Sequence, residues 1–428
     1  MARSALAAVA VAAAAALAAA QTLPGSNMPP LNVDRNDITV SGISSGGFMA
    51  VQLHVAFSAT FSKGLGVLAG GPYWCAMDNV EIALTSCMSV GYTIDSSYLE
   101  LVAKWTAYSG FADPTTNMRD SNVWVLSAQQ DTVVETEVVK KLEEFYTSYV
   151  ADPSRIKGVY NQSGEHSQLT LDYGNACTTL AEPFLNKCDF DAAGALLQHI
   201  FEDSLAPPPS TAFNGTVYSF DQGIFFDSKV WAAAFGMGPT GFVYVPKQCE
   251  AGTQCRLHVA LHGCEMTQKD IGQQYVLHGG YNSWADANDM VVLYPQAYTN
   301  VLNPKGCFDW WSYAGLSYAS NVGSQTLTIK RMVDSLIGQP RTPNVTLCNG
   351  QQEAALAAWV DKAQAVDISH STVLQAGAFD DERLNAQLGE GPWIDGQRCW
   401  PSKGMAGFIP GWKGTPKTSL QRPSLRGL

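Results

Sequence analysis

The feature that most constrains this chain is a serine framed by glycines between a short strand and a helix. A β-branched strand is predicted at Asp37–Val40, and apolar residues at steps of three and four predict a helix over Phe48–Phe57. Between them stands Gly42-Ile43-Ser44-Ser45-Gly46. In this context the Gly-x-Ser-x-Gly pattern indicates a nucleophile elbow, a strained turn that projects the serine hydroxyl from the sheet. The segment therefore predicts an α/β fold with Ser44 as nucleophile.

The same turn offers a donor for a negative charge that develops during a reaction. The backbone N–H of Ser45, at the start of the helix, can donate to an oxyanion. Two alternatives stay open at this point. The serine and glycines can form a turn that only caps a helix, and Ser45 can replace Ser44 as the attacking group.

Strands and helices alternate along most of the chain. Further strands are expected at 64–70, 123–126, 241–246, 257–264 and 290–295, and further helices at 98–108, 135–149 and 325–336. The Pro- and Asn-rich stretch Leu23–Asn36 is expected to be irregular. This alternation predicts a mostly parallel central sheet with helices on both faces, as in the α/β-hydrolase fold.

A serine nucleophile needs a base and an orienting acid, which this fold supplies in the order Ser, Asp or Glu, His. Asp131 follows the strand at 123–126, at the end where the active sites of open sheets gather, whereas Asp113 and Asp120 precede that strand. His166 is the first histidine beyond Asp131. The alternatives are a helix-capping role for Asp131 and a packing role for His166. The other histidines considered lie in helical, loop or tail surroundings: His54, His199, His278 and His370.

A His-Gly pair occurs late in the chain, at Leu261-His262-Gly263-Cys264. In α/β-hydrolases a loop of this type supplies an oxyanion donor, but it normally precedes the nucleophile. A circular permutation would explain the reversed order, and it is tolerable where the chain termini lie close together. We then expect the N–H of Cys264 to lie beside that of Ser45, with His262 structural. The alternative is a buried strand end without a catalytic role.

Composition excludes several classes of function. The chain has 26 Lys and Arg against 38 Asp and Glu, a net charge of −12, which opposes a nucleic-acid partner. Gly64–Ala69 matches a degenerate dinucleotide fingerprint, but no helix is predicted directly after it, so a nicotinamide cofactor is disfavoured. No Cys-x-x-Cys occurs. Neither a metal nor a cofactor is expected.

The N-terminus indicates export. Residues 1–20 are expected to be a signal peptide, residues 21–348 a catalytic domain and residues 349–428 an extension of unassigned role. No later stretch is apolar enough to span a membrane, so we expect a secreted, extracellular protein. Ten cysteines then suggest disulfides, which for the short loops predicts the sequential pairs Cys75–Cys87, Cys177–Cys188 and Cys249–Cys255. Three sequons could be glycosylated: Asn161, Asn214 and Asn344.

Five segments in one order resemble the secreted polyhydroxybutyrate depolymerases of fungal type, a family of circularly permuted, single-domain α/β-hydrolases. The segments are Ser41–Ala50, Gln130–Val134, Gly164–His166, Leu261–Cys264 and Cys307–Trp311. The resemblance implies Ser44 as nucleophile, Asp131 as orienting acid, His166 as base, and the amides of Ser45 and Cys264 as oxyanion hole. It also implies that Trp310 and Trp311 line a crevice for a polyester, with core packing as the alternative for each. Phe308 replaces one tryptophan of the family's Cys-Trp-Asp-Trp pattern.

The resemblance implies a serine esterase that hydrolyses polyhydroxybutyrate-type polyester, or its oligomers, through an acyl-enzyme. The expected partner is an ester polymer, contacted at its surface. Two alternatives remain. One is a feruloyl or acetyl-xylan esterase, and the other is a catalytically silent polymer-binding protein of the same fold.

Overall fold

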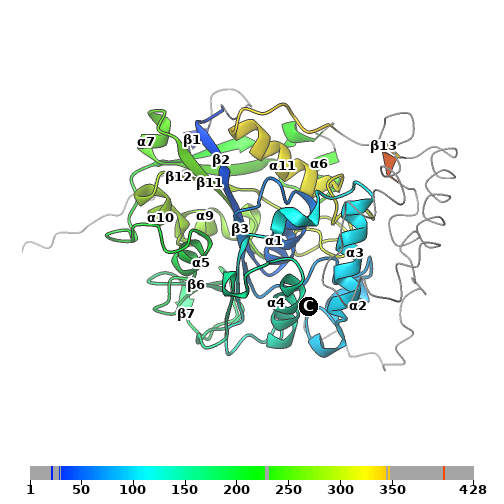
Figure 1. The fold of residues 1–428 in the computed structure, drawn as a ribbon. Coiled ribbons are helices and arrows are strands. Elements are labelled where there is room, and N and C mark those ends of the chain that lie inside the picture. The colour runs from blue at the N-terminus through cyan, green and yellow to red at the C-terminus, as the bar shows by residue number, and fades with distance from the viewer. Residues whose placement is uncertain are drawn as a thin grey trace, which may run out of the picture.

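The computed structural model describes residues 21–22, 28, 30–226, 231–343, 346–347 and 399–400, and a twisted sheet lies at the centre of this part (Figure 1). Its order from edge to edge is β1 (Gln21–Thr22), β9 (Thr216–Asp221), β10 (Thr240–Val245), β12 (Met290–Tyr294), β11 (Cys255–Leu261), β2 (Val33–Ile43), β3 (Gly64–Leu68), β4 (Asn122–Leu126) and β5 (Ile156–Val159). The strands from β12 to β5 pair in parallel, and β10 is antiparallel to both its neighbours. The first long strand of the chain therefore lies in the middle of the sheet.

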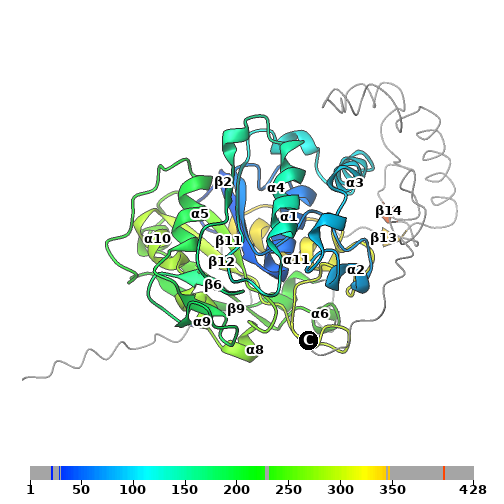
Figure 2. The ribbon, with the colours of Figure 1, turned by 90° about the horizontal axis from the view of Figure 1, so that it is seen from below.

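Each face of the sheet is covered by helices (Figure 2). One layer contains α1 (Ser45–Ala56), α3 (Ser96–Tyr108), α4 (Thr136–Thr147) and α11 (Ser324–Leu336), and the other contains α5 (Ala192–Ile200), α9 (Gln274–His278) and α10 (Tyr281–Ala287). The strands serve both layers by alternation. In β4, Val123 and Val125 join the first core cluster, whereas Trp124 and Leu126 join the second. A strand buried on both faces has to be apolar throughout, as these runs are.

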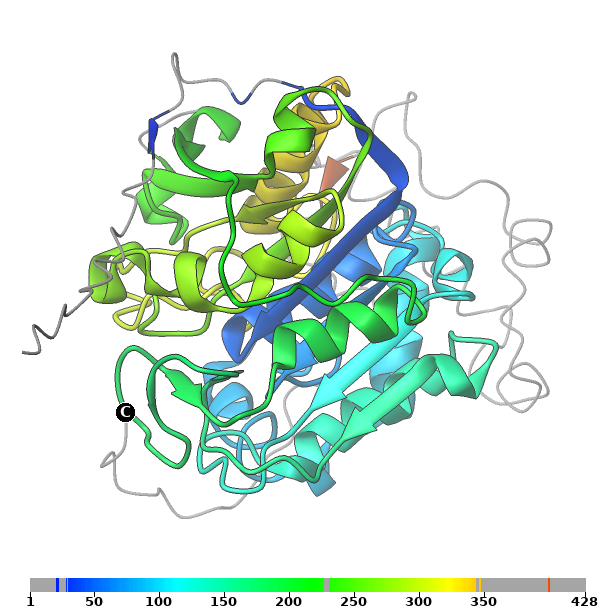
Figure 3. The ribbon, with the colours of Figure 1, turned by 90° about the vertical axis from the view of Figure 1, so that its left-hand side faces the viewer.

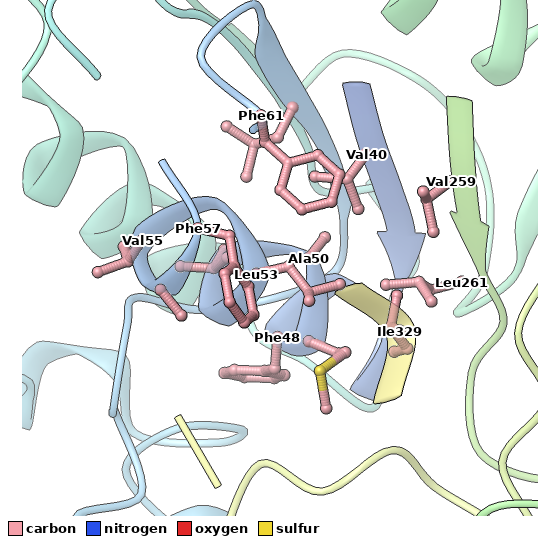
Figure 4. Packing of buried hydrophobic residues seen from close by; sticks show 14 of the residues in the cluster. Val40, Phe48, Ala50, Leu53, Val55, Phe57, Phe61, Val259, Leu261 and Ile329 are labelled. Carbon is pink, nitrogen blue, oxygen red and sulfur yellow. The ribbon is translucent and has the colours of Figure 1, made fainter. Parts of the chain in front are cut away.

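Helix α1 crosses the middle of the first layer, and every one of its residues is buried. Figure 4 shows Ala50, Leu53 and other side chains of α1 in one buried cluster with Val40 of β2 and Val259 of β11. A helix that is buried on all sides has to be enclosed by other elements. Its enclosure fixes the position of its first residues, which follow directly from β2.

Shorter elements complete the described residues. The helical ones are α2 (Val80–Leu84), α6 (Trp231–Ala234), α7 (Lys247–Glu250), α8 (Gln268–Ile271), η1 (Gly91–Thr93), η2 (Thr115–Met118), η3 (Pro153–Arg155) and η4 (Gln222–Phe225). A small parallel sheet has the order β6 (Gln168–Thr170), β8 (Leu185–Lys187), β7 (Asn175–Ala176), and β13 (Thr346–Leu347) pairs with β14 (Cys399–Trp400). The small sheet begins two residues after His166, so it lies beside the predicted base.

Four disulfides join cysteines of the described residues. Three confirm the predicted sequential pairs: Cys75–Cys87, Cys177–Cys188 and Cys249–Cys255. The fourth, Cys264–Cys307, closes a separation of 43 residues and was not predicted. It joins the residue after His262-Gly263 to the segment that contains Trp310. Across the same residues, no helix has the length and apolarity needed to cross a membrane.

Each predicted strand and helix is present, but some bounds differ: β3 ends at Leu68 and β11 at Leu261, two and three residues before the expected ends. The start of the sheet needs a further correction. Leu23–Asn36 was expected to be irregular, which is wrong for its last four residues, because β2 begins at Val33. Val33 pairs with Cys255, and a register shift between Cys255 and Leu257 accommodates the polar residues between the paired positions. The predicted signal peptide at 1–20 and most of the extension at 349–428 lie outside the described residues.

Candidate active site

Ser44 lies in a strained turn at the junction of β2 and α1. Its φ of 55° and ψ of −124° are rare for a residue with a side chain. Two glycines make this turn sterically feasible. A Cβ atom on Gly42 would lie 2.2 Å from the carbonyl oxygen of Gly46, and a Cβ on Gly46 would lie 2.4 Å from the carbonyl oxygens of Leu261 and His262. Gly42 is therefore required by close contacts within the turn, and Gly46 by the contact between the turn and the end of β11.

Ser44 is also the accessible residue of this region. All residues from Ile38 to Ser58 are buried except Ser44, which is half-buried. The neighbouring Ser45 is 1% exposed, and its hydroxyl accepts the backbone N–H of Phe308 at 3.3 Å. Of the two serines considered as nucleophile, Ser44 is the one whose side chain can reach a substrate.

His166 and Asp131 form a hydrogen-bonded pair. Nδ1 of His166 lies 2.9 and 3.1 Å from the two carboxylate oxygens of Asp131. The Asp131 side chain is 2% exposed, and its Oδ1 also accepts the backbone N–H groups of Val133 and Val134 at 2.9 and 2.8 Å. A carboxylate can only accept, so Nδ1 carries the ring proton and Nε2 stays available as a base. The predicted acid and base are thus in contact.

The loops that carry this pair are joined along their length. The N–H of Gln129 donates to Gln162, and the N–H of Gln130 donates to Gly164, each at 2.9 Å. Further along, the Glu165 carboxylate accepts the N–H of Thr132 at 2.7 Å and that of His166 at 2.8 Å, and it accepts the Thr132 hydroxyl at 3.1 Å. Glu165 is 6% exposed. It therefore connects the backbone of the acid's loop to the backbone of the base.

Ser44, Asp131 and His166 follow the carboxyl ends of β2, β4 and β5, which end at one edge of the sheet (Figure 3). Hydrogen bonds continue past the strand ends. The backbone N–H of Ser44 donates to the carbonyl oxygen of Leu68 at 2.9 Å. In the same way, the N–H of Ala69 donates to Leu126 at 2.8 Å, and the N–H of Ser127 donates to Val159 at 3.1 Å. Because parallel strands end in the same direction, these three residues from distant parts of the chain gather at the carboxyl end of the sheet, where ligands of open α/β sheets bind.

The His-Gly loop lies directly beside the turn of Ser44. A Cβ atom on Gly263 would lie 3.3 Å from the Cβ of Ser44. Cys264 is the next residue, and its disulfide to Cys307 anchors the loop. Among the hydrogen bonds of the described residues, neither the N–H of Ser45 nor that of Cys264 has a protein acceptor. Two unused donors next to an accessible serine have the chemistry of an oxyanion hole.

The predicted tryptophans differ in accessibility. Trp310 is 6% exposed and stacks on Phe48 of α1, with ring centroids 4.1 Å apart and an interplanar angle of 12°. Trp311 is half-buried and meets Trp310 edge-on, at 5.6 Å and 85°. The segment is docked on α1 through the amide of Gln52, which donates to the carbonyl oxygen of Asp309 at 2.9 Å. Trp310 thus has a packing role, and Trp311 presents more of its ring to solvent.

Asp309 shapes the loop that carries these rings. Its buried carboxylate accepts the N–H groups of Trp311, Tyr313 and Ala314 at 3.2, 3.1 and 2.8 Å. Burial raises the pKa of this carboxyl to about 7, against the lowering effect of the backbone donors. Asp309 and Glu165 were not predicted as site residues. Their signal was position alone, since each directly precedes a predicted site residue.

Two of the rival residues have other partners. His54 is fully buried between the Tyr146 hydroxyl and the Ser121 hydroxyl, at 3.0 and 3.1 Å, and Asp113 accepts the N–H of Ala59 at 3.0 Å. Within the ranges that the structure covers, no group of three or more His, Cys, Asp or Glu side chains could hold a metal ion.

Comparison with known proteins places this geometry in context. No family model matches the chain. A poly(3-hydroxybutyrate) depolymerase of Delftia acidovorans is 44% identical over 312 residues, which is 72% of this chain and 61% of that protein. A polyhydroxybutyrate depolymerase of Talaromyces funiculosus is 35% identical over 326 residues, 72% of this chain and 92% of that protein. The chain thus spans less than two thirds of the Delftia relative.

The solved structures that this chain resembles are also PHB depolymerases. A PHB depolymerase complexed with an R3HB trimer and the crystal structure of a PHB depolymerase from Penicillium funiculosum each match with a TM-score of 0.65 and 31% identity. Each match covers 73% of this chain and 99% of the solved chain.

Proposed function

Because this chain belongs to the polyhydroxybutyrate depolymerase family, we propose that it hydrolyses the ester bonds of poly(3-hydroxybutyrate), or of its oligomers, with Ser44, His166 and Asp131 as a catalytic triad. The observation that carries the proposal is the accessible, strained Ser44 at the sheet edge that also holds the hydrogen-bonded His166–Asp131 pair. The strained backbone of Ser44 lowers stability, and such strain is typical of residues at active sites.

In the first half of the reaction, the hydroxyl of Ser44 attacks the ester carbonyl while Nε2 of His166 takes its proton. Asp131 keeps the proton on Nδ1 and stabilises the imidazolium that forms. The carbonyl oxygen becomes an oxyanion and accepts the N–H groups of Ser45 and Cys264. The tetrahedral intermediate then collapses, the bond to the alcohol oxygen breaks, and His166 gives its proton to that oxygen.

In the second half, water hydrolyses the acyl-enzyme. His166 takes a proton from the water as it attacks the acyl carbonyl, the same two N–H groups receive the oxyanion, and Ser44 leaves with the proton returned by His166. The products are an alcohol end and a carboxylic acid end of the polyester. These steps are completed by the residues named above.

Trp311, with Trp310 beneath it, is proposed to contact the methyl-branched polyester chain beside Ser44. Aromatic rings bury much apolar area at little loss of side-chain entropy. Support comes from the disulfide Cys264–Cys307, which ties this segment to the proposed oxyanion loop, and from a related PHB depolymerase that was solved with an R3HB trimer.

The test measures the release of 3-hydroxybutyrate oligomers from poly(3-hydroxybutyrate) by the purified variants Ser44→Ala and Ser62→Ala. Ser62 precedes the start of β3, at the end of the sheet away from Ser44. We expect Ser44→Ala to lose activity by a factor on the order of 10⁴ or more, and Ser62→Ala to keep it. A fluorophosphonate should label the Ser44 peptide of the wild-type chain. Unchanged hydrolysis in Ser44→Ala would refute the triad.

The same assay separates the other functions considered. Release of ferulate or acetate in place of hydroxybutyrate oligomers would indicate a carbohydrate esterase. Polymer binding without any ester hydrolysis would indicate a silent binding protein. The names of the relatives favour the polyester.

We further propose that the protein is secreted, with residues 21–348 as its catalytic domain and 349–428 as an extension. Four disulfides support an oxidising compartment. A circular permutation is supported by the position of β2, the first long strand, between β11 and β3 in the middle of the sheet.

A further inference from the structure

His262 is a buried histidine next to the proposed oxyanion loop, and its two ring nitrogens have fixed partners. Nε2 lies 3.1 Å from the backbone N–H of Ala297, and Nδ1 lies 2.6 Å from the carbonyl oxygen of Gly263. A backbone N–H can only donate, so Nε2 accepts and Nδ1 carries the proton. The ring is fully buried, and its burial lowers its pKa to about 4, so it is neutral at physiological pH.

The hydrogen bond to the carbonyl of Gly263 also orients the next backbone N–H group, that of Cys264. The carbonyl of Gly263 and the N–H of Cys264 belong to one planar, trans peptide unit, in which they point in opposite directions. The direction of the carbonyl oxygen toward His262 therefore sets the direction of the Cys264 N–H away from it. That N–H is one of the two donors left unused beside Ser44.

Other contacts hold the ends of this peptide unit without setting its rotation. The disulfide to Cys307 anchors the side chain of Cys264, and the N–H of Glu265 donates to Lys305 at 2.7 Å. On the other side, the N–H of Gly263 lies 3.3 Å from Sδ of Met266, a weak acceptor. Gly263 has no side chain, so its peptide can rotate more easily than that of another residue. The His262 bond is the strong contact to the carbonyl itself.

We infer that His262 is a positioning residue for ester hydrolysis: its Nδ1–H fixes the Gly263–Cys264 peptide so that the Cys264 N–H faces the oxyanion formed at Ser44. The inference rests on the proposed function. It assigns no contact with substrate to His262, which acts through the neighbouring peptide.

Two variants separate the two bonds of the ring. In Asn the amide nitrogen is as many bonds from Cβ as Nδ1 is in His, so His262→Asn can still donate to Gly263 but leaves the N–H of Ala297 without an acceptor. In Gln the amide oxygen matches Nε2 in the same way, so His262→Gln can still accept from Ala297 but leaves Gly263 without its donor. The pair therefore divides stability from catalysis.

The measurements are kcat and KM for a short-chain ester, the inhibition constant of an alkyl trifluoromethyl ketone, and the melting temperature. The serine oxygen adds to the ketone carbonyl, whose oxygen becomes an oxyanion. The affinity of the ketone therefore reports how well the two backbone N–H groups bind that oxyanion. For His262→Gln we expect kcat and ketone affinity to fall together by about 30-fold or more, with KM within about twofold. For His262→Asn we expect kcat and ketone affinity to stay within about fivefold of wild type. Its melting temperature should fall below that of wild type and of His262→Gln, because the N–H of Ala297 is buried without an acceptor.

Equal losses in both variants that follow the melting temperature, with unchanged ketone affinity, would show packing alone and overturn the inference. Loss of kcat in His262→Asn but not in His262→Gln would overturn it as well. If neither variant folds, the wild-type chain still gives an answer. Nitrogen-15 NMR of its histidines should show His262 protonated at Nδ1 and not at Nε2, and the opposite tautomer would refute the geometry.

Failure of the proposed function would look different. A wild-type chain that the trifluoromethyl ketone does not inhibit, or a Ser44→Ala variant with full activity, would refute the triad. A wild-type chain that is inhibited, with His262→Gln inhibited equally well, would refute only the role of His262.

Discussion

Glu165 offers a test of how the acid and the base are held together. Its carboxylate accepts three hydrogen bonds, from the N–H groups of Thr132 and His166 and from the Thr132 hydroxyl. We predict that Glu165→Ala lowers both stability and turnover, because it removes the acceptor shared by the two loops. Glu165→Gln should have a smaller effect, since its amide oxygen can still accept both N–H groups.

The magnitudes follow from these bonds. In Glu165→Ala two buried N–H groups lose their acceptor, at about 2 kcal/mol each, so the free energy of unfolding should fall by about 4 kcal/mol. In Glu165→Gln two charge-assisted bonds become neutral ones, at a cost of about 1 kcal/mol each. A shift of His166 by about 1 Å costs on the order of 100-fold in rate. We therefore expect kcat to fall about 100-fold in Glu165→Ala and about tenfold or less in Glu165→Gln.

The assay is kcat and KM for a short-chain ester at fixed pH, with urea unfolding of the same samples. Thr132→Val is the matched control, because it removes only the hydroxyl bond to the Glu165 carboxylate and keeps the N–H bond. We expect less than a threefold change in its kcat. The reasoning would be refuted if Glu165→Ala kept kcat within threefold of wild type while folding normally.

Three further predictions follow. Asp131→Asn should lower kcat by about 10³ to 10⁴ at nearly constant KM, because an amide facing Nδ1 no longer selects the reactive tautomer; a pH–rate profile checks this, and a loss below tenfold would contradict it. Gly46→Ala should lower the free energy of unfolding by about 3 kcal/mol, because its Cβ would lie 2.4 Å from two carbonyl oxygens; urea unfolding measures it, and wild-type stability would contradict the steric argument. Burial lowers the pKa of His54 to about 3, so as the pH falls His54 is protonated in the unfolded chain before it is protonated in the folded chain. The contribution of neutral His54 to stability is complete above pH 6.5 and declines as the pH falls toward 3. His54→Gln should reduce the slope of unfolding free energy against pH between 4 and 6 by about 1.4 kcal/mol per pH unit, and an unchanged slope would exclude a neutral buried His54.

Local patterns were enough to predict the elements that lead to the site. The run Val123–Leu126 is apolar because both faces of β4 are covered, and the Gly42–Gly46 turn is dictated by contacts with its immediate neighbours and with β11. Apart from the contact with β11, such signals lie within a few residues of the structure that they specify. They predicted the segments of Ser44 and Asp131, whereas His166 was predicted from the order Ser, Asp, His that the fold uses.

Features that depend on distant contacts were missed. The disulfide Cys264–Cys307 joins two loops that meet only in the folded chain, whereas the three predicted disulfides close separations of 12 residues or fewer. The small sheet of β6, β7 and β8 has strands of two or three residues, too short for a visible alternation. The bonds of Glu165 and His262 likewise involve backbone groups, which leave no trace in residue type.

The central place of β2 has a consequence for how the chain acquires its fold. Ser44 is synthesised early, yet one wall of its turn is the end of β11, and partners across these two strands are 219 residues apart. Such long-range pairing slows folding, and until β11 exists one edge of β2 stays open to other chains. A nascent chain that stops before β11 would therefore carry Ser44, Asp131 and His166 without a working site, and it would be prone to aggregate.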